Sequence, residues 1–360
     1  MRKTLTGVAL TAAVAGTLAG TGPAHAATPA WKVAQTNNLP GEDTITALTV
    51  APTGSSWAGG SQTVKDKEVP LIQHLTSKGW TTVKAPGSAG RVTALSASSS
   101  KNVWSFAVDG GIDQPARWNG TSWQWTSALH GFPATDAAAV SSANVWVVSG
   151  EPDSPPKYAE HWTGKSWHKV TLPAAATSIS AVSSKNVWAA GTRNHQAAVM
   201  HWNGSSWKLL KTPAFKLPDP YGNVELRDIV ALSSNSVWAV GGITWSCGED
   251  GDSTCAKPLI LHWNGHVWTS KLLPQTYTPL TQIGYDGAKG FWLLKGAWDP
   301  ALVHYTGGTL TTVAAPRPAG HDINMTALAT HGKTIWAGGA AFPEGDPDDP
   351  TGNGLYLRIN

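Results

Sequence analysis

Two phrases decide the fold: SSKNVWAAG at residues 183–191 and HWNGSSW at residues 201–207. The pair recurs as SSANVWVVSG with HWTGKSW, as SSKNVWSFA with RWNGTSW, and as SSNSVWAVGG with HWNGHVW. Weaker copies surround Trp57, Trp292 and Trp336. Self-similarity at a regular period is the sequence signature of repeat architectures. The 360 residues therefore contain seven copies of one structural unit.

Spacing within each copy predicts four short strands. The basic residue of the second phrase is followed six positions later by an aromatic residue or leucine in six copies: His74 to Trp80, Arg117 to Trp123, His161 to Trp167, His201 to Trp207, His262 to Trp268 and His304 to Leu310. A constant gap containing Asn-Gly indicates a tight hairpin. The gap from the first tryptophan to the basic residue varies from 12 (Trp292 to His304) to 24 (Trp238 to His262), which indicates a loop that accepts insertions.

A four-stranded unit repeating about every 46 residues is typical of a β-propeller, whose blades stack radially because one unit cannot bury both faces alone. The last copy ends in LRIN at residues 357–360, which resembles a third strand. Its missing outer strand resembles WKV at residues 31–33. We therefore predict an all-β, seven-bladed β-propeller with four-stranded blades, closed by residues 31–37 completing the last blade.

The N-terminus resembles an export signal. Arg2 and Lys3 precede an apolar run, and the small-residue pattern Ala24-His25-Ala26 follows. We expect residues 1–26 to be a signal peptide and residues 27–360 to form a single secreted domain, with no other stretch able to span a membrane. Without residues 1–26, 24 basic residues face 23 acidic ones, a balance that argues against a nucleic-acid partner. We also expect a monomer.

Tryptophan is abundant and charge is scarce. The chain has 20 Trp against 5 Phe and 6 Tyr, and 14% of its residues are charged where about a quarter is usual. Seventeen of the tryptophans fall at repeat positions, where we expect them to fill the wedges between blades. Trp125, Trp245 and Trp298 stand outside the pattern. The recurrent basic residues occur once per blade, so we expect a repeated structural hydrogen bond there and no metal site.

The VWAVG and HWNGxxW phrases resemble those of bacterial secreted propellers related to the tectonin-type repeat. The resemblance covers nearly all of residues 27–360. Tectonin-like propellers include sugar-binding lectins, so the resemblance implies carbohydrate recognition. It assigns no binding residue, because no ligand motif matches position by position.

Loops between the second and third strands and connections between blades lie on one side of the disc, which we call the variable face and where we expect function. The segment Gly242–Pro258 is predicted to be its longest loop, with a disulfide between Cys247 and Cys255. Trp245 in this loop and Trp298 in the next blade suggest a sugar platform. Acidic residues accompany them: Glu249, Asp250, Asp252 and Asp299. The alternative is that both rings pack beneath long loops.

Two further sets of acids are candidates. Asp136 and Asp228 each lie ten residues before a Val-Trp tryptophan, at equivalent positions in blades three and five. Such a pair could perform general acid/base chemistry or hold a cation, or could be solvated residues of the channel. The stretch Glu344–Gly354 contains Asp346, Asp348 and Asp349, yet it lacks the order of a helical calcium-binding loop and is expected to be a flexible acidic loop.

The sequence contains no GxSxG elbow, HExxH, phosphate loop or dinucleotide fingerprint. We therefore predict a secreted module, without a cofactor, that binds carbohydrate or a cell-surface polymer through the variable face. A glycan lyase or hydrolase that uses Asp136 and Asp228 is one alternative. A protein-protein interaction scaffold is the other.

Overall fold

The computed structural model describes residues 30–88, 90–110, 112–131, 133–149, 157–248, 253–296, 300–345 and 352–359. Blade 1 consists of β2 (Asp43–Val50), β3 (Ser56–Val64), β4 (Lys67–Thr76) and β5 (Gly79–Val83), and blade 2 consists of β6 (Arg91–Ser99), β7 (Asn102–Asp109), β8 (Ile112–Trp118) and β9 (Trp123–Trp125). Blade 3 consists of β10 (Ala134–Ser141), β11 (Asn144–Ser149), β12 (Tyr158–Trp162) and β13 (Trp167–Thr171). Blade 4 consists of β14 (Ala175–Ser183), β15 (Asn186–Arg193), β16 (Gln196–Trp202) and β17 (Trp207–Leu210). Blade 5 consists of β18 (Asn223–Ser233), β19 (Ser236–Cys247), β20 (Ser253–Trp263) and β21 (Trp268–Leu272). Blade 6 consists of β22 (Leu280–Tyr285), β23 (Gly290–Lys295), β24 (Ala301–Thr306) and β25 (Thr309–Ala314). Blade 7 consists of β26 (His321–His331), β27 (Thr334–Pro343), β28 (Asn353–Ile359) and β1 (Trp31–Thr36).

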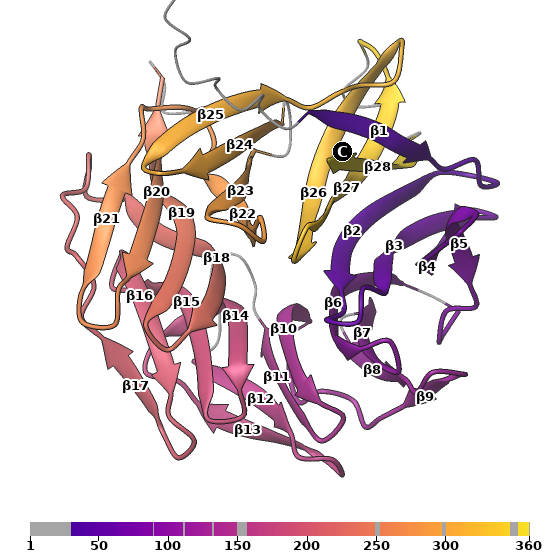
Figure 1. The fold of residues 1–360 in the computed structure, drawn as a ribbon, viewed down its shortest axis with the longest axis horizontal. Coiled ribbons are helices and arrows are strands. Elements are labelled where there is room, and N and C mark those ends of the chain that lie inside the picture. The colour runs from indigo at the N-terminus through magenta and orange to yellow at the C-terminus, as the bar shows by residue number, and fades with distance from the viewer. Residues whose placement is uncertain are drawn as a thin grey trace, which may run out of the picture.

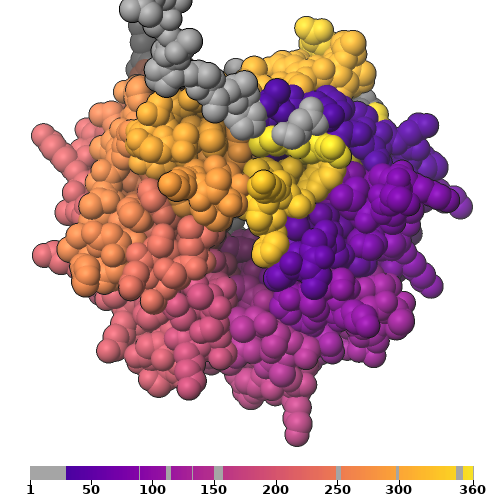
Figure 2. Space-filling model, viewed as in Figure 1, coloured from indigo at the N-terminus to yellow at the C-terminus, as the bar shows by residue number. Residues whose placement is uncertain are grey.

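Seven four-stranded antiparallel sheets surround a central axis (Figure 1), which confirms the predicted seven-bladed propeller. The first strand of each blade lies nearest the axis, and side chains leave only a narrow hollow at the centre of the face in Figure 2. Within each blade, strands that follow one another in the chain pair with each other, except that β1 joins the last blade. The blades follow one another around the ring in chain order (Figure 1). The described residues include no helix.

The two ends of the described chain close the ring. Strand β1 lies beside β28, with Trp31 opposite Ile359 and Val33 opposite Leu357 (Figure 1). Trp31 is buried and its ring contacts Trp292 of blade 6 at 5.2 Å between centroids. The predicted completion of the last blade by the N-terminal strand is therefore confirmed.

Tryptophans join the blades. At six of the seven seams, a tryptophan on the second strand of one blade meets the edge of an outer-strand tryptophan from the next: Trp57 with Trp123, Trp104 with Trp167, Trp146 with Trp207, Trp188 with Trp268, Trp292 with Trp31, and Trp336 with Trp80. At the remaining seam Trp238 meets Tyr305 instead. Edge-to-face pairs contribute about 0.5–1.5 kcal/mol each beyond their burial. The repeat tryptophans are thus packing residues, as predicted.

The recurrent histidines also serve the fold. In five blades the imidazole packs on the second-strand tryptophan of its own blade, with centroids between 3.9 and 4.5 Å apart. The rings are stacked for His74, His161, His262 and His304, and tilted by 31° for His201. The expected hydrogen bond is present for His74, His201 and His304, and Arg117 donates from Nε to Asn102 Oδ1 at 2.7 Å. Ring stacking was not anticipated and is the more regular of the two contacts.

Every inner strand contains a bulge at the same place, and β6, β10, β14 and β18 each contain a second register shift nearer their ends. The residue that bulges is Thr46, Thr93, Thr135, Thr177, Arg227, Thr281 or Thr326. The threonine hydroxyl can bond to the neighbouring blade: Thr46 Oγ1 donates to Val92 O at 2.6 Å, and Thr177 Oγ1 donates to Leu226 O at 2.5 Å. Blade 5 alone has arginine at this position.

Candidate functional site

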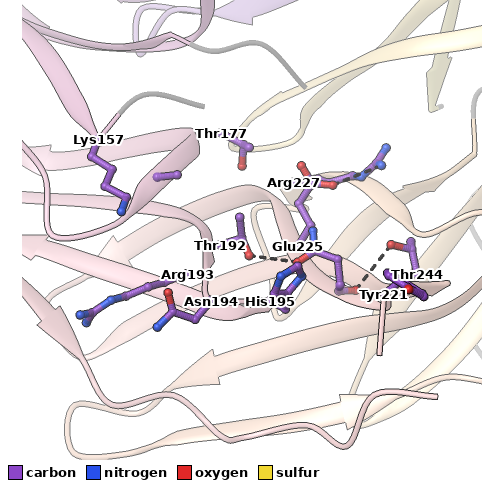
Figure 3. A pocket seen from close by; sticks show the side chains of 12 residues that line it. Lys157, Thr177, Thr192, Arg193, Asn194, His195, Tyr221, Glu225, Arg227 and Thr244 are labelled. Carbon is purple, nitrogen blue, oxygen red and sulfur yellow. Dashed lines mark hydrogen bonds and ion pairs between the residues drawn. The ribbon is translucent and has the colours of Figure 1, made fainter. Parts of the chain in front are cut away.

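A pocket of about 820 Å³ opens between blades 4 and 5 on the variable face (Figure 3). Its walls come from β14 and the loop between β15 and β16, from the connection into blade 5, and from the first half of β18. Thr244 of β19 and Lys157, which precedes β12 of blade 3, complete the lining. The lining side chains are mostly polar, and they are Lys157, Ala175, Thr177, Thr192, Arg193, Asn194, His195, Tyr221, Asn223, Glu225, Arg227 and Thr244. Such a concave, hydrogen-bonding site at a seam of the ring is a natural place for a polar ligand.

Hydrogen bonds fix the two walls of this pocket to each other. Asn194 and His195 form a two-residue turn with φ of 51° and 58°, a conformation that asparagine tolerates better than most residues. The carbonyl of His195 accepts the backbone N–H of Val224 at 3.2 Å. Thr192 Oγ1 donates to Asn223 Oδ1 at 3.3 Å. The seam beneath a ligand is therefore held before any ligand binds.

Arg227 lies at the inner end of the pocket. Its side chain is 40% exposed, and its Nη2 lies 3.3 Å from Glu225 Oε2. Strand alternation explains this pairing, because residues two apart on one strand face the same side. The ion pair orients the guanidinium while leaving other N–H groups of Arg227 available to a ligand.

Tyr221 is the most exposed large aromatic side chain described at the pocket. It is 90% exposed, and its backbone N–H donates to Asp219 Oδ1 at 2.7 Å, which fixes the turn that carries it. An exposed ring with a hydroxyl beside a polar cavity can stack on the C–H face of a sugar. Tyr221 lies in a connection between repeats, so no repeated pattern in the sequence points to it.

The segment Gly242–Pro258 differs from the predicted loop. Strands β19 and β20 continue as a paired hairpin through it, from Gly242 opposite Pro258 to Cys247 opposite Ser253. The predicted disulfide between Cys247 and Cys255 is present near its end.

The predicted sugar platform is described only in part. Trp245 is half-buried against the apolar cluster of blades 4 and 5, which includes Phe215, and Lys257 Nζ lies 6.0 Å from its ring centre. Its neighbour Thr244 lines the pocket. The other predicted residues of this platform lie outside the described residues: Glu249, Asp250, Asp252, Trp298 and Asp299.

The structure brings Asp136 and Asp228 together through Ser178 of the blade between them. Ser178 Oγ lies 2.7 Å from Asp136 Oδ2 and 3.0 Å from Asp228 Oδ1. Each carboxylate also accepts a backbone N–H of the following blade, Ile179 at 2.8 Å for Asp136 and Ile283 at 2.7 Å for Asp228. These residues follow the bulge and link blades 3, 4, 5 and 6, and neither acid lines the pocket of Figure 3.

One hydroxyl proton cannot satisfy both contacts of Ser178. If both carboxylates were ionised, one of the two oxygen-oxygen contacts would contain no hydrogen, so a proton on one acid is needed to complete the chain. Burial raises the pKa of Asp136 to about 6. Burial and the negative charge of Asp136 raise the pKa of Asp228 to about 7. The three residues therefore form an inter-blade connection whose charge changes near neutral pH.

The acidic stretch Glu344–Gly354 is described only at its ends, since Asp346, Asp348 and Asp349 lie outside the described residues. Among the residues that the structure does describe, no group of three or more histidine, cysteine or acidic side chains is placed to hold a metal ion. In the same part of the chain, no helix is long and apolar enough to cross a membrane.

Known structures share the fold. Neither a protein-family model nor a curated protein sequence matches the chain. Virginiamycin B lyase from Staphylococcus aureus is similar at 14% identity and a TM-score of 0.61, over 92% of this chain and 100% of the lyase chain. YCF48 bound to D1 peptide is similar at 14% and 0.55, over 90% and 94%. The WD40 propeller domain of Doa1 is similar at 12% and 0.58, over 91% and 97%. At such identities the likeness shows the fold alone.

Proposed function

We propose that this protein is a secreted binding module that recognises carbohydrate or a cell-surface polymer in the pocket between blades 4 and 5. The observation that carries the proposal is the pocket itself, in which asparagine, threonine and charged groups surround about 820 Å³ beside the exposed ring of Tyr221. Sugars are bound by this combination of hydrogen-bonding side chains and an aromatic face. The tectonin-like repeat phrases and the disulfide support a lectin-like role outside the cytoplasm.

The hydrogen bonds of Asp136 and Asp228 favour a binding function over hydrolysis or elimination by these two acids. Every oxygen of these two carboxyl groups lies within hydrogen-bond distance of a donor: Ala137 N, Ile179 N and Ser178 Oγ for Asp136, and Ile229 N, Ile283 N and Ser178 Oγ for Asp228. A substrate would have to displace bonds that join the blades. The lyase alternative therefore predicts turnover that is lost in Asp136→Asn, whereas a binding module predicts no turnover.

The proposal is tested by screening the protein against neutral and acidic glycans and cell-wall polymers, followed by Tyr221→Ala. Loss of one stacking ring is expected to weaken binding by about five- to tenfold while thermal unfolding stays unchanged, because Tyr221 is solvent-exposed. Tyr277→Ala is the matched control, since Tyr277 is 73% exposed in the next inter-blade connection and does not line the pocket.

Three outcomes of this screen are decisive. Binding that Tyr221→Ala and Tyr277→Ala weaken equally would contradict the assignment of the pocket. Binding that is lost in Trp298→Ala but kept in Tyr221→Ala would favour the platform predicted from sequence. Absence of any glycan binding or turnover would overturn the proposal and favour a protein partner.

A further inference from the structure

We propose that the pocket between blades 4 and 5 takes an acidic glycan, a saccharide chain whose carboxylate or phosphate groups bind the basic side chains at its two ends. The inference rests on the proposed function and names the ligand class of that site. Three cationic side chains, Lys157, Arg193 and Arg227, line the cavity against one carboxylate, Glu225. The whole chain has 26 basic and 23 acidic residues, so this local excess is not a general property of the protein.

The cationic groups are placed at separate ends of the pocket. Figure 3 shows Lys157 and Arg193 on one side and Arg227 on the other, with His195 and Glu225 between them. Lys157 and Arg193 are exposed, and within the described part of the chain neither takes part in an ion pair. A single small anion would reach only one end, whereas an extended chain with repeated negative charges would reach both.

Arg227 is the strongest single indication of an anionic ligand. In the other six blades the bulge residue is threonine, and at four seams its hydroxyl donates to a carbonyl of the next blade: Thr46 to Val92, Thr135 to Thr177, Thr177 to Leu226, and Thr326 to Ile45. Blade 5 replaces this group with an arginine that lines the pocket. The exchange gives up a possible hydrogen bond between blades and supplies a planar donor suited to bidentate binding of carboxylate or phosphate.

The saccharide part of the ligand is favoured by the rest of the lining. Asn194, Thr192, Asn223 and Thr244 supply neutral donors and acceptors at the pocket, and Tyr221 supplies an exposed ring. Arg227 and Lys157 alone would suit any polyanion. Amides and hydroxyls can donate to phosphate as well, but a stacking face adds nothing to phosphate binding, and together these groups match the hydroxyls and C–H faces of a sugar.

The decisive experiment compares chemically matched probes by isothermal titration calorimetry. The carboxylate pair is oligogalacturonate and its methyl ester, which has the same chain without charge. The phosphate pair is a phosphorylated mannose oligosaccharide and its dephosphorylated form. We expect the charged member of at least one pair to bind at least about tenfold more tightly than the neutral member, since charge-assisted hydrogen bonds are worth about 1.5–3 kcal/mol. The pair that shows the preference identifies the acidic group.

Arg227→Thr is the central variant, because threonine is the residue of the other six blades and is compatible with the bulge. It is expected to weaken the charged probe by at least about tenfold and to leave the neutral probe and the thermal unfolding temperature unchanged. Arg91→Thr is the control, because Arg91 is also an exposed arginine near the start of an inner strand. Arg91 lines a different pocket. Lys157→Ala tests the opposite end of the site independently.

The outcomes separate this inference from the proposed function. Equal binding of charged and neutral probes would overturn the acidic-glycan inference and leave the glycan-binding proposal standing. Equal weakening by Arg227→Thr and Arg91→Thr would replace the specific site with diffuse charge attraction, and so would also overturn it. Failure of every saccharide, charged or neutral, to bind would overturn both.

Discussion

The Asp136–Ser178–Asp228 connection predicts an unusual pH dependence of stability, which Asp228→Asn isolates. In the folded protein the pKa of Asp228 is raised from 3.8 to about 7, by burial first and then by the charge of Asp136. A carboxyl group with a raised folded-state pKa binds more protons folded than unfolded between these values. Its stabilising contribution is therefore complete below about pH 4 and is lost as the pH rises to about 7.

The magnitude follows from the size of the shift. Each pKa unit corresponds to about 1.4 kcal/mol, so a shift from 3.8 to about 7 corresponds to about 4 kcal/mol between pH 4 and pH 8. Asparagine cannot ionise. In Asp228→Asn its amide can donate to Ser178 Oγ while its carbonyl accepts from Ile283 N, and Ile229 N retains Ser178 Oγ as an acceptor at 3.2 Å. The variant should lose stability relative to the wild type at pH 4 and regain up to about 4 kcal/mol by pH 8.

The quantity to measure is the difference in the free energy of unfolding between Asp228→Asn and the wild type at each pH. Burial lowers the pKa of several histidines, namely His74, His161, His201 and His262, and groups with a lowered pKa contribute stability that is lost as the pH falls below about 6.5. This opposite slope is present in both proteins and cancels. Equilibrium denaturant unfolding, followed by tryptophan fluorescence from pH 4 to pH 8, supplies the two free energies.

Asp66→Asn is the control for charge removal, since Asp66 is an exposed turn residue with φ of 59° that asparagine also tolerates. Its difference from the wild type should stay nearly constant over this range. A difference between Asp228→Asn and the wild type that is equally constant would refute the single-proton connection. A difference that instead grows more unfavourable toward pH 8 would show that Asp228 is stabilised in its ionised form.

Two further predictions concern closure of the ring. Trp31→Ala is expected to lower the free energy of unfolding by about 3–5 kcal/mol, because a buried ring between blades 6 and 7 is lost. Trp125→Ala is the control, because its ring is 49% exposed. In the same denaturant measurement, Trp125→Ala should lower the free energy of unfolding far less. Gly354→Ala is expected to cost about 1–3 kcal/mol, measured by thermal unfolding, because a Cβ there would lie 2.6 Å from Asn37 Nδ2 and 2.7 Å from Asp43 Oδ1. An unchanged unfolding temperature would contradict tight packing at that glycine.

Repetition made the architecture predictable. A motif that recurs seven times reports the same environment seven times, so the spacing within each copy predicted four strands per blade. The likeness of residues 31–33 and 357–360 to the repeat phrases predicted the completion of the last blade. The role of the repeat tryptophans followed as well, because a bulky residue at a constant position in every blade must meet the same neighbour. Stacking of the histidines was missed, because sequence distance does not show that His201 faces Trp188 across paired strands.

The pocket was not predictable in the same way. Its walls include a connection between repeats, in which Tyr221 has no counterpart to align, and the loop between β15 and β16, whose length varies among the blades. One clue was present, since Arg227 interrupts a column of threonines in the inner strands. The significance of this arginine is visible only once the threonines are known to occupy bulges that lie beside the next blade. Equivalent placement of Asp136 and Asp228 was predicted, but the residue that joins them, Ser178, occupies the same column in blade 4 and shows its role only in three dimensions.

The residues that follow the bulges differ around the ring. They are polar in blades 3 to 6, namely Asp136, Ser178, Asp228 and Gln282, and alanine in the other three. Where alanine is present near the closure, a second polar network joins blade 7 to blade 1: Asn37 Nδ2 donates to Asp43 Oδ1 at 3.1 Å and to Gln73 Oε1 at 3.2 Å, and Tyr356 donates to Gln73.

The first network joins blades 3 to 6 and the second joins blades 7 and 1. The pocket adjoins the first, because Thr177 and Arg227, which line it, directly precede Ser178 and Asp228. Buried hydrogen bonds between blades hold the groups that they join in one arrangement, so each network fixes the seams that it spans. Weakening the closure should therefore lower stability without changing the affinity of molecules that remain folded. Ionising the Asp136 and Asp228 pair should act at the seams beside the pocket, so ligand affinity is expected to depend on this proton while remaining insensitive to Gly354→Ala.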